Sequence, residues 1–190
     1  MKRLSPGGLL HTCCAPCSLK CIDSLADEQI WPTLFWYNPN IHPYTEYRSR
    51  RDTLVKFAAD AGLELISDDV YGLRPFVRGI YTKDATEFAD KTPQRCTYCY
   101  RLRLEKTAAR AAEAGFDYFS TTLLISPYQN HDLIRQIGEE LGENYGVKFL
   151  YRDFRPLFRA GQGKARELGL YMQKYCGCIF SEEERYLANT

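Results

Sequence analysis

The sequence predicts an α/β fold built on a mostly parallel sheet with helices on both faces. Short apolar runs alternate with helical patterns along the 190-residue chain, and parallel strands need long crossovers of the kind that helices supply. Glycine also directly follows three of the predicted helices, where a left-handed C-terminal cap requires it, at Gly62, Gly115 and Gly146.

Each strand is predicted from a short apolar run bounded by turn residues. These runs span residues 8–10, continuing into His11, and then 31–37, 64–66, 118–124 and 147–151. Helical patterns cover residues 18–26, 45–61, 97–114 and 130–145.

Two segments fall outside this alternation. Residues 68–94 contain Gly72, Pro75 and Gly79, which interrupt any regular period, so an irregular insertion is predicted there. Helices are expected around a cysteine-bearing turn in the C-terminal segment, residues 155–190. The length of the whole chain, 1–190, suits a single domain.

The composition is that of a globular protein without an overall basic field. The chain is 45% hydrophobic and 26% charged, with a formal net charge of +1, so any nucleic-acid binding must come from local patches. No apolar run approaches the roughly 18–20 residues of a membrane span, and the first six residues lack the apolar core of a signal peptide. We therefore expect a cytoplasmic protein that does not enter a membrane.

Cysteine is the unusual component of this sequence. Without a secretory leader, and with enough apolar residues to fold unaided, the chain is expected to keep its thiols reduced for metal or redox chemistry. The eight cysteines are Cys13, Cys14, Cys17, Cys21, Cys96, Cys99, Cys176 and Cys178.

The first thiol group lies where the first predicted strand turns into a helix. Cys13, Cys14 and Cys17 would meet the positive end of that helix, which lowers thiol pKa values. Pro16 suits the first helical turn. Cys21, one turn further on, is expected to be a small buried packing residue.

Two further thiol pairs complete the set. Cys96 and Cys99 share one helical face, and Gly177 lets the backbone bend between Cys176 and Cys178. The two CxxC pairs, Cys14/Cys17 and Cys96/Cys99, lie much too far apart in sequence for a zinc ribbon. Eight thiols also exceed the ligands of one tetrahedral zinc. The count favours a [4Fe–4S] cluster with a second metal or redox site, although zinc accepts the same ligands.

The same residues carry a family likeness. The chain resembles the QueH type of epoxyqueuosine reductase along nearly its whole length. The matching blocks, in order, are residues 10–17 (LHTCCAPC), 35–43, 46–48, 95–104 (RCTYCYRLRL), 118–127 and 175–181.

The resemblance implies a Rossmann-like, HUP-type three-layer sandwich. It also implies deoxygenation of the epoxide ring of epoxyqueuosine in tRNA, the last step of queuosine biosynthesis, by an iron–sulfur enzyme. By the same resemblance, the cluster would be held by Cys13, Cys14, Cys96 and Cys99.

A second site is implied beside the cluster. The resemblance assigns it Cys176 and Cys178, together with Cys17 where some family members carry aspartate. Its metal would be a second mononuclear iron or zinc, and a sulfur ligand in place of oxygen favours softer ions. The alternative is a Cys176–Cys178 dithiol that oxidises to a disulfide during turnover.

The expected partners are the tRNA that carries epoxyqueuosine and an external electron donor. No Gly-rich dinucleotide fingerprint follows the first strand. Arg48 and Arg51, with Arg50 between them, are candidate RNA contacts beside several tyrosines, although a solvated basic helix face gives the same pattern. Of the histidines, His11 is expected to be packed at its strand end.

Three other functions fit parts of the pattern. A thiol–disulfide oxidoreductase would use Cys14 and Cys17, but it leaves the later four cysteines unexplained. An ATP-dependent tRNA thiolase would need a Ser-Gly-Gly loop after the first strand, and this sequence lacks one there. A zinc-stabilised RNA-binding module would bind zinc tightly and show no redox change.

Overall fold

The computed structural model describes residues 7–81 and 94–187. In these ranges a sheet of five parallel strands has the order β3-β2-β1-β4-β5. The strands are β1 (Gly8–His11), β2 (Thr33–Trp36), β3 (Leu65–Ser67), β4 (Tyr118–Thr121) and β5 (Lys148–Phe149).

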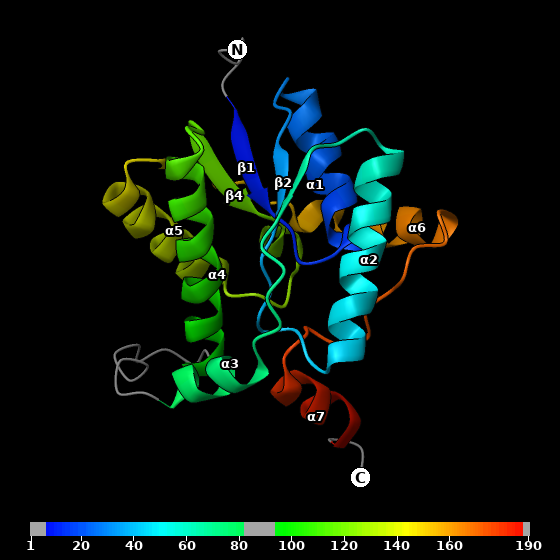
Figure 1. Cartoon of the computed structure of the whole chain (residues 1–190). Coiled ribbons are helices and arrows are strands. Elements are labelled where there is room, and N and C mark those ends of the chain that lie inside the picture. Colours follow the sequence, from blue (N-terminus) through cyan, green and yellow to red (C-terminus); the bar gives the residue numbers. More distant parts are fainter. Residues whose placement is uncertain (1–6, 82–93, 188–190) are drawn as a thin grey trace.

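Helices cover both faces of this sheet and make three layers. In Figure 1, α4 and α5 lie on one side of the strands, and α1, α2 and α6 lie on the other. The α-helices are α1 (Ala15–Asp27), α2 (Tyr44–Asp60), α3 (Leu73–Ile80), α4 (Gln94–Glu113), α5 (His131–Tyr145), α6 (Phe158–Glu167) and α7 (Ile179–Leu187). The predicted α/β sandwich is confirmed.

Strand β1 lies at the switch point of the sheet. It pairs with β2 on one side and β4 on the other, with Leu10 level with Leu34 and Ser120. The connection after β1 leads to β2 on one side of β1, and the chain later returns to β4 on the other side. This reversal opens a crevice at the carboxyl ends of these strands. Leu10 and Leu34 are buried in the apolar core that holds the sheet and its helices together.

The predicted strands and the glycine caps are confirmed. Gly62, Gly115 and Gly146 all adopt positive φ angles, between 64° and 69°, which an L side chain rarely tolerates. Strands β2, β4 and β5 are shorter than predicted, whereas β1 matches its predicted range and β3 is shifted by one residue. The strand predicted over residues 118–124 is corrected at residues 122–124, because these residues belong to the 3₁₀ helix η2 (Thr122–Ile125) and do not extend β4.

The irregular insertion is also corrected in part. Residues 73–80 form α3, with Pro75 in its first turn, where a backbone donor has no helical partner. Residues 82–93 of the predicted insertion lie outside the described residues. Helices α6 and α7 lie on the two sides of the Cys176–Cys178 turn, as predicted. A second short 3₁₀ helix, η3 (Arg155–Leu157), directly precedes α6.

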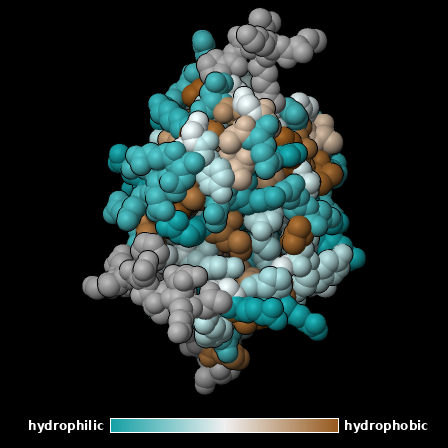
Figure 2. Space-filling view, turned by 60° about the vertical axis from the view of Figure 1, so that its left-hand side comes forward, coloured by the Kyte–Doolittle hydropathy of each residue, from teal (hydrophilic) through white to brown (hydrophobic). Residues whose placement is uncertain are grey.

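A helix that spans a membrane needs sufficient length and an apolar composition. Across residues 7–81 and 94–187, no helix has both the length and the apolar composition to cross a bilayer. The face in Figure 2 is mostly hydrophilic, with apolar side chains in small scattered groups.

Candidate metal and thiol site

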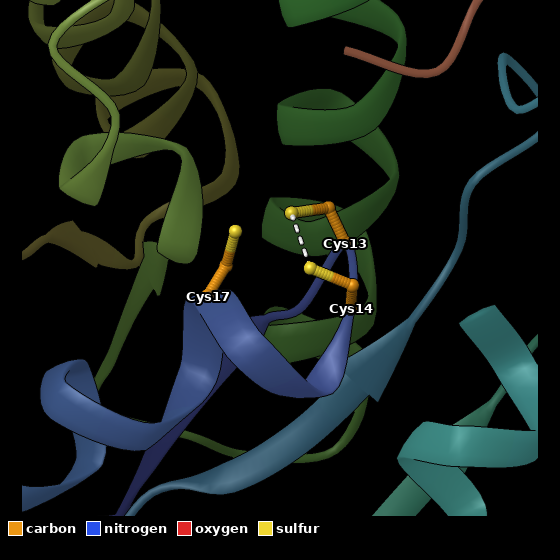
Figure 3. Close-up of side chains that lie close together, drawn as sticks. All are labelled: Cys13, Cys14 and Cys17. Atoms are coloured by element: carbon orange, nitrogen blue, oxygen red, sulfur yellow. Dashed lines mark hydrogen bonds between the residues drawn. The ribbon is translucent and has the colours of Figure 1, made fainter. Parts of the chain in front are cut away.

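Three cysteines meet at the carboxyl end of β1. The sulfur atoms of Cys13, Cys14 and Cys17 all lie within 4.8 Å of one another, and those of Cys13 and Cys14 are 3.9 Å apart. Figure 3 shows the three side chains converging from the β1–α1 junction and the first turn of α1. In the described part of the chain, no other group of three or more potential ligands is as close.

The backbone of this junction is held by side-chain hydrogen bonds. Cys14 is the extended N-cap of α1, and its carbonyl oxygen accepts a 2.8 Å hydrogen bond from Ser18. The backbone N–H of Cys13 donates to the hydroxyl of Thr122 at 3.3 Å, and Asn38 donates to the carbonyl of Thr12. The sulfurs therefore project from a fixed turn at the positive end of a helix.

The three thiols have unequal acidities. Hydrogen bonds with Cys14 and Cys17 hold the pKa of Cys13 well below its usual value. Burial raises the pKa of Cys14, and the hydrogen bond with Cys13 raises that of Cys17. Of the three thiols, Cys13 is therefore the most easily deprotonated, and binding of a metal ion would require all three to be thiolates.

The other four site cysteines come from α4 and from the turn before α7. Cys99 and Cys178 are buried with Phe76, whereas Cys96 is half-buried and Cys176 is exposed. Burial, followed by the charge of Cys176, raises the pKa of Cys96 to about 11. Electrostatic interactions link these four thiols to one another, and Cys176 to Cys13, so we call them the second thiol group. No three of their sulfurs lie as close together as those of the first group.

Arg103 is a buried cation associated with both thiol groups. Its side chain is 2% exposed, and its Nε donates a 3.1 Å hydrogen bond to the carbonyl oxygen of Cys99. Burial alone would lower its pKa, but the negative charges of Cys99, Cys176 and Cys13 raise it. Within the described residues, its Nη2 has no hydrogen-bond partner.

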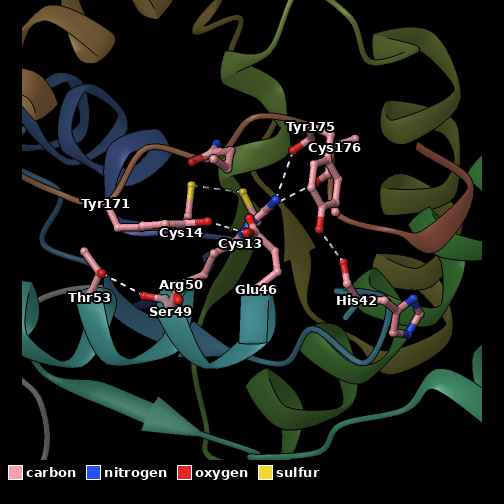
Figure 4. Close-up of polar contacts among 12 residues, drawn as sticks. Cys13, Cys14, His42, Glu46, Ser49, Arg50, Thr53, Tyr171, Tyr175 and Cys176 are labelled. Atoms are coloured by element: carbon pink, nitrogen blue, oxygen red, sulfur yellow. Dashed lines mark hydrogen bonds and ion pairs between the residues drawn. The ribbon is translucent and has the colours of Figure 1, made fainter. Parts of the chain in front are cut away.

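Arg50 fastens the Cys176 segment to α2. It is 1% exposed, pairs with Glu46 at 2.6 Å, and donates to the backbone carbonyls of Cys176 and Tyr175 at 2.9 and 3.0 Å. Tyr171 also donates to Glu46, so the pair holds the segment at two places (Figure 4). Arg50 therefore holds this segment from inside the protein. Its burial corrects the prediction from the sequence that it is a candidate RNA contact.

The other two arginines of this helix differ in exposure. Arg48 is exposed. Arg51 is partly buried and forms ion pairs with Asp52 and Asp69. An RNA phosphate would have to compete with these carboxylates for Arg51, whereas Arg48 faces solvent.

The remaining polar candidates have structural partners. His11 is buried between the Thr121 hydroxyl, at 2.9 Å, and the Tyr37 carbonyl, and burial lowers its pKa to about 4. It is packed at its strand end, as predicted. His42 is buried too, and its Nε2 donates to the Pro39 carbonyl. Cys21 is fully buried, as expected for a packing residue.

A cavity of about 290 Å³ connects the first thiol group with the C-terminal segment. We call it the thiol cavity. Two glutamine amides face its sulfurs: Gln173 Nε2 lies 3.3 Å from the Cys17 sulfur, and Gln129 Nε2 lies 3.7 Å from that of Cys176. The residues lining it are Cys13, Cys17, Thr122, Leu123, Ser126, Tyr128, Gln129, Phe158, Gln162, Gln173, Lys174, Tyr175 and Cys176.

The fold and the site together define a three-layer α/β protein with a thiol site at the switch point of its parallel sheet. A solved structure with a similar fold is that of a predicted subunit of a tRNA methyltransferase from Methanocaldococcus jannaschii. It superposes with a TM-score of 0.51 at 12% identity, over 84% of this chain and 74% of the other.

The family follows from sequence comparison. Residues 9–184 match the family model of the epoxyqueuosine reductase QueH. The epoxyqueuosine reductase QueH of Thermotoga maritima is 40% identical over 93% of this chain and 91% of its own length. That of Dehalococcoides mccartyi is 36% identical, with 96% of each chain covered. The chain belongs to the QueH family of epoxyqueuosine reductases, which are oxidoreductases.

Proposed function

We propose that this QueH family member removes the epoxide oxygen of epoxyqueuosine in tRNA with a [4Fe–4S] cluster. The ligands would be Cys13, Cys14, Cys96 and Cys99. The observation that carries the proposal is the group of Cys13, Cys14 and Cys17 within 4.8 Å of one another, because it places two of these four ligands, Cys13 and Cys14, at the switch point where α/β proteins bind ligands. Thiolate ligands at such a point suit an iron–sulfur cluster.

The buried charges around the thiols fit such a group. Four thiolates and a cluster carry net negative charge, which is costly to bury without compensation. Arg103 and Arg50 are buried cations whose pKa values are affected by the nearby thiols. The Nη2 of Arg103, without a hydrogen-bond partner among the described residues, would find sulfur acceptors in the bound cluster.

The remaining thiols would form the adjacent site. Cys17, Cys176 and Cys178 would hold a second iron or zinc. Cys17 and Cys176 both line the thiol cavity, so a ligand there would contact this site directly. One distance also favours a different assignment of the cysteines to the two sites. The sulfurs of Cys13 and Cys14 are 3.9 Å apart, close to the ~3.8 Å between two sulfurs that bind the same tetrahedral metal ion. That assignment would give Cys13, Cys14 and Cys17 to one ion.

The reaction needs two electrons and two protons, which convert the epoxide to an alkene and water. When bound, the cluster supplies electrons singly, and a metal ion with an open position acts as a Lewis acid toward oxygen. Cys176 is exposed at the cavity, so solvent protons can reach the departing oxygen there. An external carrier would supply the electrons.

A Cys176–Cys178 dithiol is the second candidate for the electron source. Its oxidation to a disulfide releases two electrons and two protons, which balances the reduction. Gly177 between the two cysteines has a φ of 143°, so the turn already bends sharply. Labelling of the free thiols after a single turnover separates the two cases. Only the dithiol reaction converts Cys176 and Cys178 to a disulfide, which a thiol reagent cannot label.

Arg48 is proposed as an RNA contact because it is exposed on α2. Arg48→Ala should reduce the slope of log affinity for tRNA against log salt concentration by about one, the contribution of one phosphate contact. A mutant with the parent's salt slope would remove Arg48 from the interface.

The activity itself is tested by incubating the anaerobically purified protein with tRNA that carries epoxyqueuosine and with dithionite. Mass spectrometry of the digested nucleosides should show loss of one oxygen atom. If the nucleoside keeps its mass while iron is fully loaded, the proposed function is wrong.

A further inference from the structure

The thiol cavity has the size of a site for one small planar group. Its volume of about 290 Å³ lies at the lower end of the range for small-molecule sites, roughly 300–1,000 Å³. That space suits one base, while the sugar and phosphates of an RNA strand would remain outside it. Lys174 also lines the cavity and is exposed, so it offers a cation for a phosphate at the opening.

An aromatic side chain stands at the opening of this cavity. Tyr128 lines the cavity yet is 83% exposed. Its ring meets that of Phe158, at the start of α6, edge to face with ring centres 6.1 Å apart. A large aromatic ring that is both exposed and fixed against another ring is a ready surface for stacking.

The turn that carries Tyr128 is held by hydrogen bonds. The backbone N–H of Tyr128 donates to the Ser126 hydroxyl at 3.3 Å. The side-chain oxygen of Gln129 accepts a 2.8 Å hydrogen bond from Tyr100, which leaves the Gln129 amide N–H facing the Cys176 sulfur. The ring and the amide are thus placed before any ligand arrives, which lowers the entropic cost of binding.

We propose that the thiol cavity receives one base lifted from a single-stranded RNA loop, with the base stacked on Tyr128. The substituent of that base would then face the sulfurs of Cys17 and Cys176. This inference rests on the proposed function, since it names the residue that holds the substrate at the same site. Bases in single-stranded loops are commonly bound by stacking on aromatic side chains.

The test combines a protein change with an RNA change. Binding of a synthetic anticodon stem-loop that carries epoxyqueuosine is measured by fluorescence anisotropy, beside the same stem-loop with an abasic site at that position. For the parent protein, the abasic site should weaken binding roughly ten-fold, the loss typical of one stacked base. We call this loss of affinity the abasic penalty. Tyr128→Ala should weaken binding of the intact stem-loop to a similar extent and should lose most of the abasic penalty.

Two control variants sharpen the result. Tyr128→Phe keeps the ring and should bind like the parent. Trp31→Ala removes a ring that is 68% exposed just before the start of β2, at the opposite end of the strands from the thiols, and it should keep the full abasic penalty.

The two proposals fail in different ways. If the parent protein does not bind the stem-loop, the proposed function is contradicted. If the parent binds and Tyr128→Ala retains the parent's full abasic penalty, the base does not stack on Tyr128 and the inference is wrong.

Discussion

The guanidinium of Arg50 donates a 2.9 Å hydrogen bond to the backbone carbonyl of Cys176, 126 positions away in the sequence. The contact joins the middle of α2 to the segment that carries two of the site thiols. The position of Cys176 thus depends on a buried ion pair that lies outside the thiol groups.

Arg50→Ala should destabilise the protein by about 3 kcal/mol or more, because it leaves the buried Glu46 carboxylate without its cation. Urea unfolding measures this loss. Lys56→Ala is the matched control, since Lys56 and Asp60 form an i,i+4 pair on the exposed side of the same helix, where such pairs contribute about 0.5 kcal/mol or less. Equal effects of the two changes would mean that Arg50 is no clamp.

Arg103→Gln should lower iron retention and shift the reduction potential of the bound cluster to a more negative value. The change removes a buried positive charge that favours the reduced, more negative state of the cluster. Iron analysis and a spectroscopic redox titration measure both effects. Arg101→Gln, two residues earlier on α4 and paired with Glu140 at the surface, should match the parent; a shift of the same size there would contradict a specific role for Arg103.

Cys176→Ser and Cys178→Ser should each keep the visible chromophore and lose deoxygenation of the tRNA nucleoside. The reason is the proposed division, in which these thiols hold the second site and not the cluster. Absorption spectra and nucleoside mass spectrometry of the same samples measure both properties. Cys21→Ser alters a buried thiol outside both groups and should leave both unchanged. Loss of the chromophore in Cys176→Ser would place that thiol on the cluster.

Cys17→Asp tests the division within the first thiol group. If Cys17 binds the second metal, a carboxylate can replace its sulfur, and activity should persist when iron is supplied. Iron analysis and the nucleoside assay are run together. Should Cys17→Asp abolish the cluster while Cys14→Ala spares it, Cys14 and Cys17 must exchange roles.

The fold was predictable because its signals are local. Apolar runs marked the strands, and glycine followed three helices at positions that adopt positive φ. The prediction was wrong at residues 122–124, which were assigned to a strand but belong to the 3₁₀ helix η2. There the Thr121 hydroxyl accepts a hydrogen bond from the Leu123 N–H and starts a 3₁₀ turn.

The site was less predictable because its contacts span the chain. The sequence identified the thiols, but the ligand roles assigned to them remain a prediction. The roles of Arg103 and Arg50 were missed, since charged side chains usually face solvent. The i,i+4 spacing of Glu46 and Arg50 was the only local signal for that pair, and the spacing does not distinguish a buried pair from an exposed one.

Metal analysis is the most direct test of the central claim that these thiols hold an iron–sulfur cluster. The protein is purified anaerobically, and iron, zinc and sulfide are measured together with the absorption spectrum, for the parent and for Cys96→Ala. The account predicts a brown parent with about four or more iron atoms per chain, and a pale variant that has lost them. A colourless parent that contains zinc, or a Cys96→Ala variant that keeps all its iron and its colour, would contradict the account.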